Sequence, residues 1–155
     1  MRLVQLTPDD YRDLRKTYAQ IEYSHSVKGE ERLFNHSLYR AITSKAIRTR
    51  PQFMEDYNTL GREMYFLKDG DEIKGFVELC FYDSMCDIIE FAVLEKGKGL
   101  GSALFDKTME IIKEHKIRNV QLWCEFAGAQ VFWAKKGFKK FYKQGLTYFK
   151  LKIRQ

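Results

Sequence analysis

Three glycines at alternate positions, Gly97, Gly99 and Gly101, stand between an apolar segment and a segment with helical periodicity. Glycine adopts positive φ readily and lets a ligand approach backbone N–H groups with no Cβ in the way. The first turn of the helix that follows would have unpaired N–H groups and the positive end of the helix dipole. Lys96 and Lys98 add positive charge beside them. The segment therefore predicts a site for phosphate oxygens.

Two widespread nucleotide motifs do not fit this segment. The dinucleotide fingerprint needs the order GxGxxG in a parallel β-α-β unit, whereas this segment has GxGxG after predicted antiparallel strands. The phosphate loop of nucleotide triphosphatases needs Gly-Lys-Ser/Thr after four intervening residues, which the segment lacks. A tight turn without a ligand is the structural alternative.

The elements around the glycines predict one mixed sheet with helices packed on it, a mixed α/β (α+β) fold. Strands are predicted at 2–6, 64–68, 73–82, 86–94, 120–125, 138–142 and 147–153. Helices are predicted from Thr7 to about Ile21, from about Gly29 to before Pro51, over 53–60, at 99–115 and at 129–136. Short turns at 69–71 and 83–84 predict that three consecutive strands are antiparallel.

Charge is divided unevenly along the 155 residues, a length that suits one domain. Residues 1–95 have 13 Lys/Arg and 17 Asp/Glu, whereas residues 96–155 have 14 Lys/Arg and 4 Asp/Glu. This division predicts that the second half binds an anion and that a cation binds near the first half. The basic half also contains the glycine segment and has no aromatic RNA-binding motif, so we do not expect nucleic acid as a partner.

Several other classes are excluded by composition. No apolar run approaches the roughly 20 residues that a membrane span needs, and polar residues at 7–10 interrupt the N-terminal apolar stretch. Cys80, Cys86 and Cys124 form no CxxC pair, and the three histidines stand apart. We expect neither a disulfide framework nor a metal site, and a reduced, cytoplasmic protein without a membrane partner.

Two blocks of sequence resemble one family. Lys96-Gly97-Lys98-Gly99-Leu100-Gly101 resembles the Gln/Arg-x-x-Gly-x-Gly/Ala pyrophosphate loop of the GNAT superfamily of acyl-CoA-dependent N-acetyltransferases, with Lys96 in the first position. Residues 126–138 resemble that superfamily's Asn-x-x-Ala-x-x-Phe-Tyr-x-Lys-x-Gly-Phe. The matching residues are Ala129, Phe132, Lys135, Gly137 and Phe138, while Phe126 replaces Asn and Trp133 replaces Tyr. The resemblance covers about residues 63–153.

The resemblance implies a GNAT-like fold, a mostly antiparallel sheet flanked by helices, with a V-shaped splay between its fourth and fifth strands. Acetyl-CoA would enter that splay as the acyl donor. The implied CoA-binding residues are Ala92, Val93 and Leu94 for the pantetheine arm, Lys96, Gly97, Lys98, Gly99, Gly101 and Ser102 for the pyrophosphate, and Phe132 and Lys135 of the second block. Residues 1–155 would form a single domain, with 1–62 on the acceptor side and 63–155 binding acetyl-CoA.

Acetyl transfer to an amine needs a base that takes a proton from the ammonium. Glu90 is the favoured candidate because it lies nearest the implied thioester, and Asp87 and Glu78 are the alternatives. Strand alternation predicts that Asp87 and Glu90 lie on opposite faces of the sheet, so that at most one of them points into the site. Carboxylates that pair across strands are the structural alternative for each of them.

The resemblance assigns protonation of the departing thiolate to the Tyr that Trp133 replaces. An indole N–H donates a hydrogen bond but does not titrate in this range. The thiolate would leave unaided, Tyr142 or Tyr148 would serve as the acid, or the protein would be a weak catalyst. We expect Trp133 to be an aromatic plug at the end of its helix, and Cys124 to be a core thiol, with an acyl-cysteine intermediate as the alternative.

The acceptor is a primary amine in this interpretation, and the acidic first half favours a cationic one. A polyamine, an aminoglycoside, a lysine side chain and a protein N-terminus all fit. A non-catalytic acyl-CoA-binding sensor on the same fold is the second hypothesis, favoured by Phe126 and Trp133. The 9 Tyr, 12 Phe and 2 Trp residues are numerous for one core and make an apolar homodimer face plausible.

Overall fold

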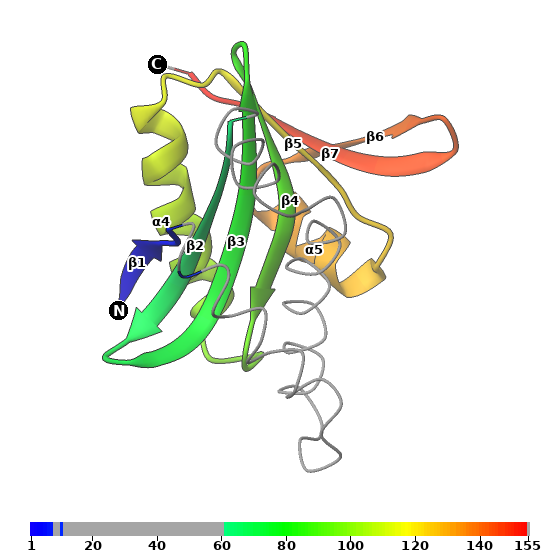
Figure 1. The fold of residues 1–155 in the computed structure, drawn as a ribbon. Helices are drawn as coiled ribbons and strands as arrows, with labels where there is room; N and C mark the ends of the chain where they lie inside the picture. Colours follow the sequence, from blue (N-terminus) through cyan, green and yellow to red (C-terminus); the bar gives the residue numbers. More distant parts are fainter. Residues whose placement is uncertain (8–9, 11–60, 155) are drawn as a thin grey trace.

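The computed structural model describes residues 1–7, 10 and 61–154, in which seven strands form one sheet in the order β1-β2-β3-β4-β5-β7-β6 (Figure 1). The strands are β1 (Arg2–Gln5), β2 (Arg62–Asp69), β3 (Glu72–Tyr82), β4 (Met85–Val93), β5 (Asn119–Trp123), β6 (Lys139–Lys143) and β7 (Leu146–Lys152). Helix α4 (Leu100–Glu114) joins β4 to β5, and helix α5 (Ala127–Lys135) joins β5 to β6.

The seven predicted strands and the two predicted helices after residue 98 are confirmed, each end within two residues of its expected place. The predicted helices at 7–21, 29–50 and 53–60 lie outside the described residues. The predicted cap at Thr7 is confirmed, because the Asp10 N–H donates to the Thr7 Oγ1 at 3.2 Å. The Thr7 N–H donates in return to the Asp10 Oδ2 at 2.9 Å, and this reciprocal pair satisfies two backbone donors at the start of a helix.

The predicted splay lies between β4 and β5, which form the parallel pair of a sheet whose other pairs are antiparallel. Parallel strands need a crossover connection, which α4 provides. The β4–β5 ladder runs from Met85↔Asn119 to Asp87↔Gln121 and ends there. Beyond that point β4 continues beside β3 while β5 pairs with β7, so the two strands diverge (Figure 1). The mixed, mostly antiparallel fold with a V-shaped splay is confirmed.

A β-bulge in β4 overturns the expected placement of the two carboxylates. Glu78 pairs with Glu90, but the next pair is Leu79 with Ile88, which leaves Ile89 as the extra residue. The extra residue shifts the alternation of β4 by one position, and Asp87 therefore pairs with Cys80 on the same face as Glu90. The prediction of opposite faces was wrong because a period of two assumes an unbroken ladder.

The hydrophobic core lies between α4 and α5 and one face of the sheet. The strands contribute residues at alternate positions, among them Leu67, Val77, Leu79, Ile88, Val120, Leu122 and Phe149. The helices contribute Leu104, Phe105, Met109, Ile112 and Trp133. Val77 and Leu79 lie on the face of β3 that packs on α4. Side chains alternate along a strand, so Glu78, between them, points away from α4. No helix in the described part of the chain is long and apolar enough to cross a bilayer.

Candidate functional site

The glycine turn presents open backbone groups at the start of α4. Gly97 and Gly99 have φ of 78° and 75°, a region that L side chains rarely adopt, and a Cβ on either would meet nothing within 4 Å. The Ala103 N–H donates to the Gly99 carbonyl at 3.0 Å as the first bond of the helix. The N–H groups before Ala103 therefore have no partner within the helix. No side chain caps α4 and its first turn has no acidic residue, so this end favours an anion.

Gly101 serves packing rather than ligand approach. A Cβ on Gly101 would lie 3.3 Å from the Phe132 Cε2, which is tighter than ordinary contact. Phe132 also packs against Phe91 of β4, with ring centroids 5.7 Å apart, and against Phe105 of α4 at 6.4 Å. The expectation that all three glycines open space for a ligand is therefore corrected: Gly97 and Gly99 do so, and Gly101 lets α5 approach α4.

The lysines near the turn differ in what they contact. Lys98 pairs with Glu95 at 2.7 Å, and this ammonium lowers the pKa of the Glu95 carboxyl. Part of the positive charge expected from Lys98 is thus compensated. Lys96 is exposed at the turn, and Lys135, which the resemblance selects, is exposed on α5.

Lys136, which follows α5, contacts the start of α4 instead. Its Nζ donates to the Ser102 Oγ at 2.9 Å and lies 5.3 Å and 5.5 Å from the ring centroids of Phe105 and Phe132. A cation beside the positive end of a helix is unfavourable unless an anion binds there. The signal for this residue in the sequence is a run of lysines from Lys135 to Lys143, which is typical of a solvated basic face, with a contact to the 3′-phosphate of CoA or to an acidic partner as the alternative.

The edge of β4 that faces the splay is defined by one hydrogen bond. The Leu94 N–H donates to the Lys74 carbonyl at 2.8 Å, so the backbone of Leu94 is directed toward β3. Backbone groups alternate along a strand, and the ladder is regular here, so Ala92 also faces β3 while Phe91 and Val93 face the splay. The expected set Ala92, Val93 and Leu94 is shifted: Val93 stays, and Phe91 joins it.

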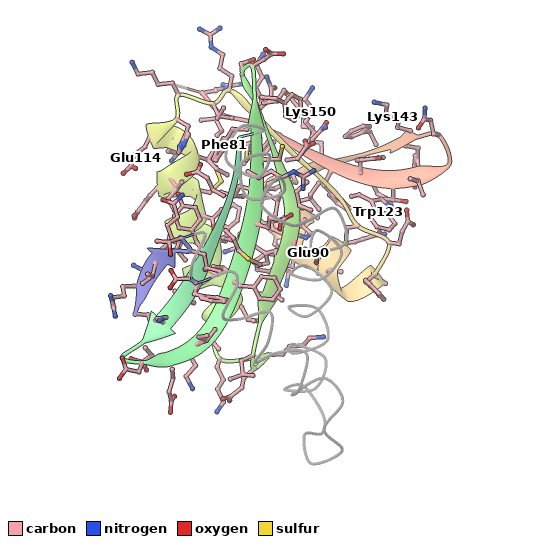
Figure 2. All side chains as sticks on the ribbon, viewed as in Figure 1. Phe81, Glu90, Glu114, Trp123, Lys143 and Lys150 are labelled. Atoms are coloured by element: carbon pink, nitrogen blue, oxygen red, sulfur yellow. The ribbon has the colours of Figure 1, made fainter. Side chains whose placement is uncertain are left out.

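Three carboxylates gather on the face of the sheet away from α4. Glu78 is fully buried, and its Oε1 lies 3.5 Å from Nη1 of Arg62. Glu90, directly opposite Glu78, is half-buried and lies on β4 beside the splay (Figure 2). Asp87 is two ladder steps further along, roughly 7 Å away along the strand. This side of β3 and β4 therefore concentrates negative charge next to the open strand edge.

Asp87 belongs to a hydrogen-bonded chain that reaches β5. The Tyr82 hydroxyl donates to Oδ1 of Asp87 at 2.9 Å, and Nε2 of Gln121 donates to the Tyr82 hydroxyl at 3.1 Å. Burial and the Asp87 carboxylate raise the pKa of Tyr82 to about 12. Asp87 is thus held by a neutral phenol at the end of the β4–β5 ladder, whereas Glu90 lies where the strands have parted.

The model of the acetyltransferase (GNAT) family matches residues 11–138 of this chain. The chain belongs to this family. A splayed sheet, a glycine turn and a helix that begins at the turn are the parts of the GNAT domain described above. Within the described residues of this domain, no group of three or more His, Cys, Asp or Glu side chains could hold a metal ion.

Solved structures share the fold of this GNAT domain. The PaiA N-acetyltransferase of Thermoplasma acidophilum, solved in complex with coenzyme A, has a TM-score of 0.67 at 17% identity, with 98% of each chain covered. A GNAT acetyltransferase of Staphylococcus aureus Mu50 has a TM-score of 0.64 at 17% identity, with 99% of each chain covered. At these identities the similarity shows the fold alone.

One relative is closer in sequence. The protein YxbD of Bacillus subtilis (strain 168) is 29% identical over 75 residues, which is 47% of each chain. The matched part of this GNAT chain thus spans about half the length of that relative.

The aromatic residue at the family's Tyr position is enclosed by other rings. Trp133 is 4% exposed, and its centroid lies 4.9 Å from Phe91 and from Phe132, 5.2 Å from Phe138 and 6.0 Å from Phe105, all edge to face. This confirms the expected aromatic plug.

The two candidate tyrosines lie on different faces of the sheet. Tyr142 is 71% exposed near the tip of the β6–β7 hairpin. It pairs with Thr147, and this register places Tyr142 on the face of the sheet that carries α5. Tyr148 pairs with Trp123, on the face shared by Gln121 and Asp87. Tyr142 is therefore not brought together with Glu90, and its acid role stays a prediction.

Cys124 is buried, and burial raises the pKa of its thiol. The thiol donates to the Phe126 carbonyl, with 3.7 Å between the two atoms. A protonated, enclosed thiol is a poor nucleophile, which favours the expected core role over an acyl-cysteine intermediate.

Proposed function

We propose that this protein is an acetyl-CoA-dependent N-acetyltransferase, which transfers an acetyl group to a primary amine by direct attack with general-base assistance. The observation that carries the proposal is the open helix start at Gly97 and Gly99 beside the free edge of β4, in a chain of the GNAT family. Residues 63–155 would bind acetyl-CoA and residues 1–62 would supply the acceptor side.

The start of α4 would hold the pyrophosphate through the backbone N–H groups of Lys98, Gly99, Gly101 and Ser102. Their polarity suits an anion, and the space beside Gly97 and Gly99 is open. Lys136 would add a charge-assisted hydrogen bond, because its ammonium is already positioned by Ser102. Lys96 and Lys135, both exposed, remain proposed contacts at the rim of this site.

The open edge of β4 would bind the pantetheine arm as an added strand. Phe91 and Val93 would supply the backbone groups, since the Leu94 N–H is already used by β3. The aromatic cluster of Phe91, Phe132 and Trp133 lies behind this edge and would exclude water from the thioester.

Glu90 would act as the general base. It lies beside the splay and shares its face with Glu78 and Asp87, so that a cationic amine would be attracted to this face before it loses a proton. The neutral amine then forms the new N–C bond at the thioester carbonyl while the C–S bond breaks. Glu90 takes the proton that the ammonium loses, the second proton on nitrogen passes to solvent as the amide forms, and the thiolate of CoA takes a proton from solvent or from a tyrosine. Asp87 is the alternative base, already bonded to Tyr82.

The experiment is thiol release from acetyl-CoA in the presence of a panel of amines: a polyamine, an aminoglycoside, a lysine-containing peptide and a peptide with a free N-terminus. Amine-dependent thiol release, with a product heavier by one acetyl group on nitrogen, supports the proposal. The alternative is a non-catalytic acyl-CoA sensor, favoured by Phe126, which is 80% exposed where the family has Asn. A sensor would bind CoA and release no thiol with any amine.

Three cysteines that form no disulfide, Cys80, Cys86 and Cys124, support a reducing, cytoplasmic location. Fractionation of cells that express the tagged protein tests this location.

A further inference from the structure

The face of β5, β7 and β6 that points away from α4 and α5 carries a row of aromatic rings. Register places Trp123 of β5 beside Tyr148 of β7, and Tyr148 beside Phe141 of β6. The rings of Phe141 and Tyr148 stack with centroids 5.4 Å apart. Trp123 is 58% exposed, although it is a large apolar side chain. One row of three rings therefore crosses three strands on this side of the sheet.

Lysines flank the aromatic row on the same face. Lys139 of β6, Lys150 of β7 and Gln121 of β5 form a second row of paired residues. On each strand this row lies two residues from the aromatic row, and therefore on the same face. Lys152 continues the row along β7, and Lys143 lies on the other side of the rings on β6. All four lysines are exposed, and Figure 2 labels Lys143, Lys150 and Trp123 on this part of the sheet. We call these seven residues the aromatic–lysine face: Trp123, Phe141, Tyr148, Lys139, Lys143, Lys150 and Lys152.

The charge of this part of the chain is almost all of one sign. Residues 119–152 contain seven lysines and one acidic residue, Glu125. Glu125 accepts hydrogen bonds from Nε1 of Trp123 at 3.0 Å and from the Thr147 N–H at 2.7 Å. Its carboxylate thus anchors the Trp123 ring to the hairpin, and no other acid of residues 119–152 compensates the lysines.

We propose that the aromatic–lysine face binds single-stranded nucleic acid. Trp123 is exposed and Phe141 and Tyr148 are partly exposed, so that their rings offer a stacking surface to bases of any sequence, and lysines spaced across neighbouring strands match a phosphate backbone. The site is separate from the glycine turn, because α4 lies on the opposite side of the sheet. This inference does not depend on the acetyl-transfer proposal and replaces the sequence-based expectation that nucleic acid is not a partner.

The charge of the face disfavours a second copy of the chain as its occupant. Two aromatic–lysine faces in a symmetric dimer would bring four lysines of each copy together with no acid from residues 119–152 free to pair with them. An acidic protein would satisfy the lysines but would not need the row of rings. The combination of both features favours an anion whose repeating units are flat and aromatic.

The test is a titration of the protein with a fluorescent oligothymidylate of about 15 nucleotides, followed by anisotropy at several salt concentrations. We expect Trp123→Ala and Phe141→Ala each to weaken binding by about 5- to 100-fold, the range for loss of one stacked base. Lys150→Glu should weaken binding and reduce the salt slope by about 1. Lys113→Glu, an exposed lysine of α4, is the matched control and should have less than a twofold effect.

Five outcomes would overturn the proposal. Wild-type protein does not bind, or the two aromatic variants bind as tightly as wild type, or inorganic polyphosphate of equal charge binds equally well. In the fourth, excess CoA displaces the oligonucleotide, which would place it at the glycine turn. In the fifth, light scattering shows a dimer that dissociates on Trp123→Ala, which would make the face an interface between two copies of the chain. Equal melting temperatures of the variants ensure that loss of binding is not loss of fold.

Discussion

Glu90 lies directly opposite Glu78 on the neighbouring strand, and both side chains are on the face of the sheet away from α4. Like charges in this position destabilise a sheet, and Glu78 is fully buried. Arg62, 3.5 Å from Glu78, compensates part of this repulsion. A face that carries three carboxylates would attract an ammonium, which is the electrostatic reason for proposing a cationic acceptor.

Replacing Glu90 should separate chemistry from binding. We expect Glu90→Gln to lower kcat by about 10²- to 10⁴-fold, the contribution of a positioned base, with the Kd for CoA within twofold of wild type. Asp87→Asn should lower kcat less, because Asp87 is held by Tyr82. Steady-state kinetics with the responding amine and calorimetry with CoA measure the two effects. A larger loss in Asp87→Asn than in Glu90→Gln would transfer the role of base to Asp87.

The neighbouring lysines Lys135 and Lys136 allow a matched comparison of affinity for CoA. Lys136→Met keeps the aliphatic stem over Phe105 and Phe132 but removes the charge beside Ser102. We expect affinity for CoA to fall about tenfold, the effect of losing one charged hydrogen bond. Lys135→Met should lower affinity less than Lys136→Met does, because Lys135 is exposed on α5 and a contact at the rim is screened by solvent. Calorimetric titration of both variants compares the two losses of affinity, and a larger loss in Lys135→Met would make Lys135 the stronger contact.

Trp133 is expected to act through packing. Its ring is enclosed by four phenylalanines, so Trp133→Tyr leaves a void and buries a hydroxyl. We expect the free energy of unfolding in urea to fall by about 1–3 kcal/mol, and the acetylation rate not to rise. If the variant acetylates faster than wild type, protonation of the thiolate limits the rate, and a tyrosine at position 133 can act as the acid.

Stability should depend on pH through Glu125. Hydrogen bonds from the Thr147 N–H and Trp123 lower the pKa of its carboxyl. A lowered pKa in the folded state means that the stabilisation is complete above the unfolded pKa, about 4.3, and is lost as the pH falls through the folded value. Glu125→Gln should therefore melt below wild type at pH 7, and the difference should shrink as the pH falls through the lowered pKa of Glu125. A difference in melting temperature that persists at low pH would show that the charge of Glu125 is not the source of the stabilisation.

Most of the fold was predictable because its signals are local. Gly97 and Gly99 mark a turn at positive φ, and the Asp69–Asp71 and Asp83–Ser84 turns fix the order of three strands. The face of Asp87 was not predictable, because a single inserted residue, Ile89, reverses strand alternation and has no local signature. The role of Lys136 depends on how α5 packs on α4, a contact between segments 34 residues apart.

The central claim is that the start of α4 binds the diphosphate of coenzyme A, and calorimetric titration of the purified protein with CoA tests it most directly. Gly99→Ala places a methyl group in the open space at the turn, at a φ of 75°. Gly145→Ala, in the β6–β7 turn at a φ of 77° and equally open, is the matched control for backbone strain. We expect wild type and Gly145→Ala to bind CoA with the same affinity and Gly99→Ala to bind at least about tenfold more weakly, as for loss of one charged contact. Absence of binding by wild type, or equal affinity in all three proteins, would contradict the account.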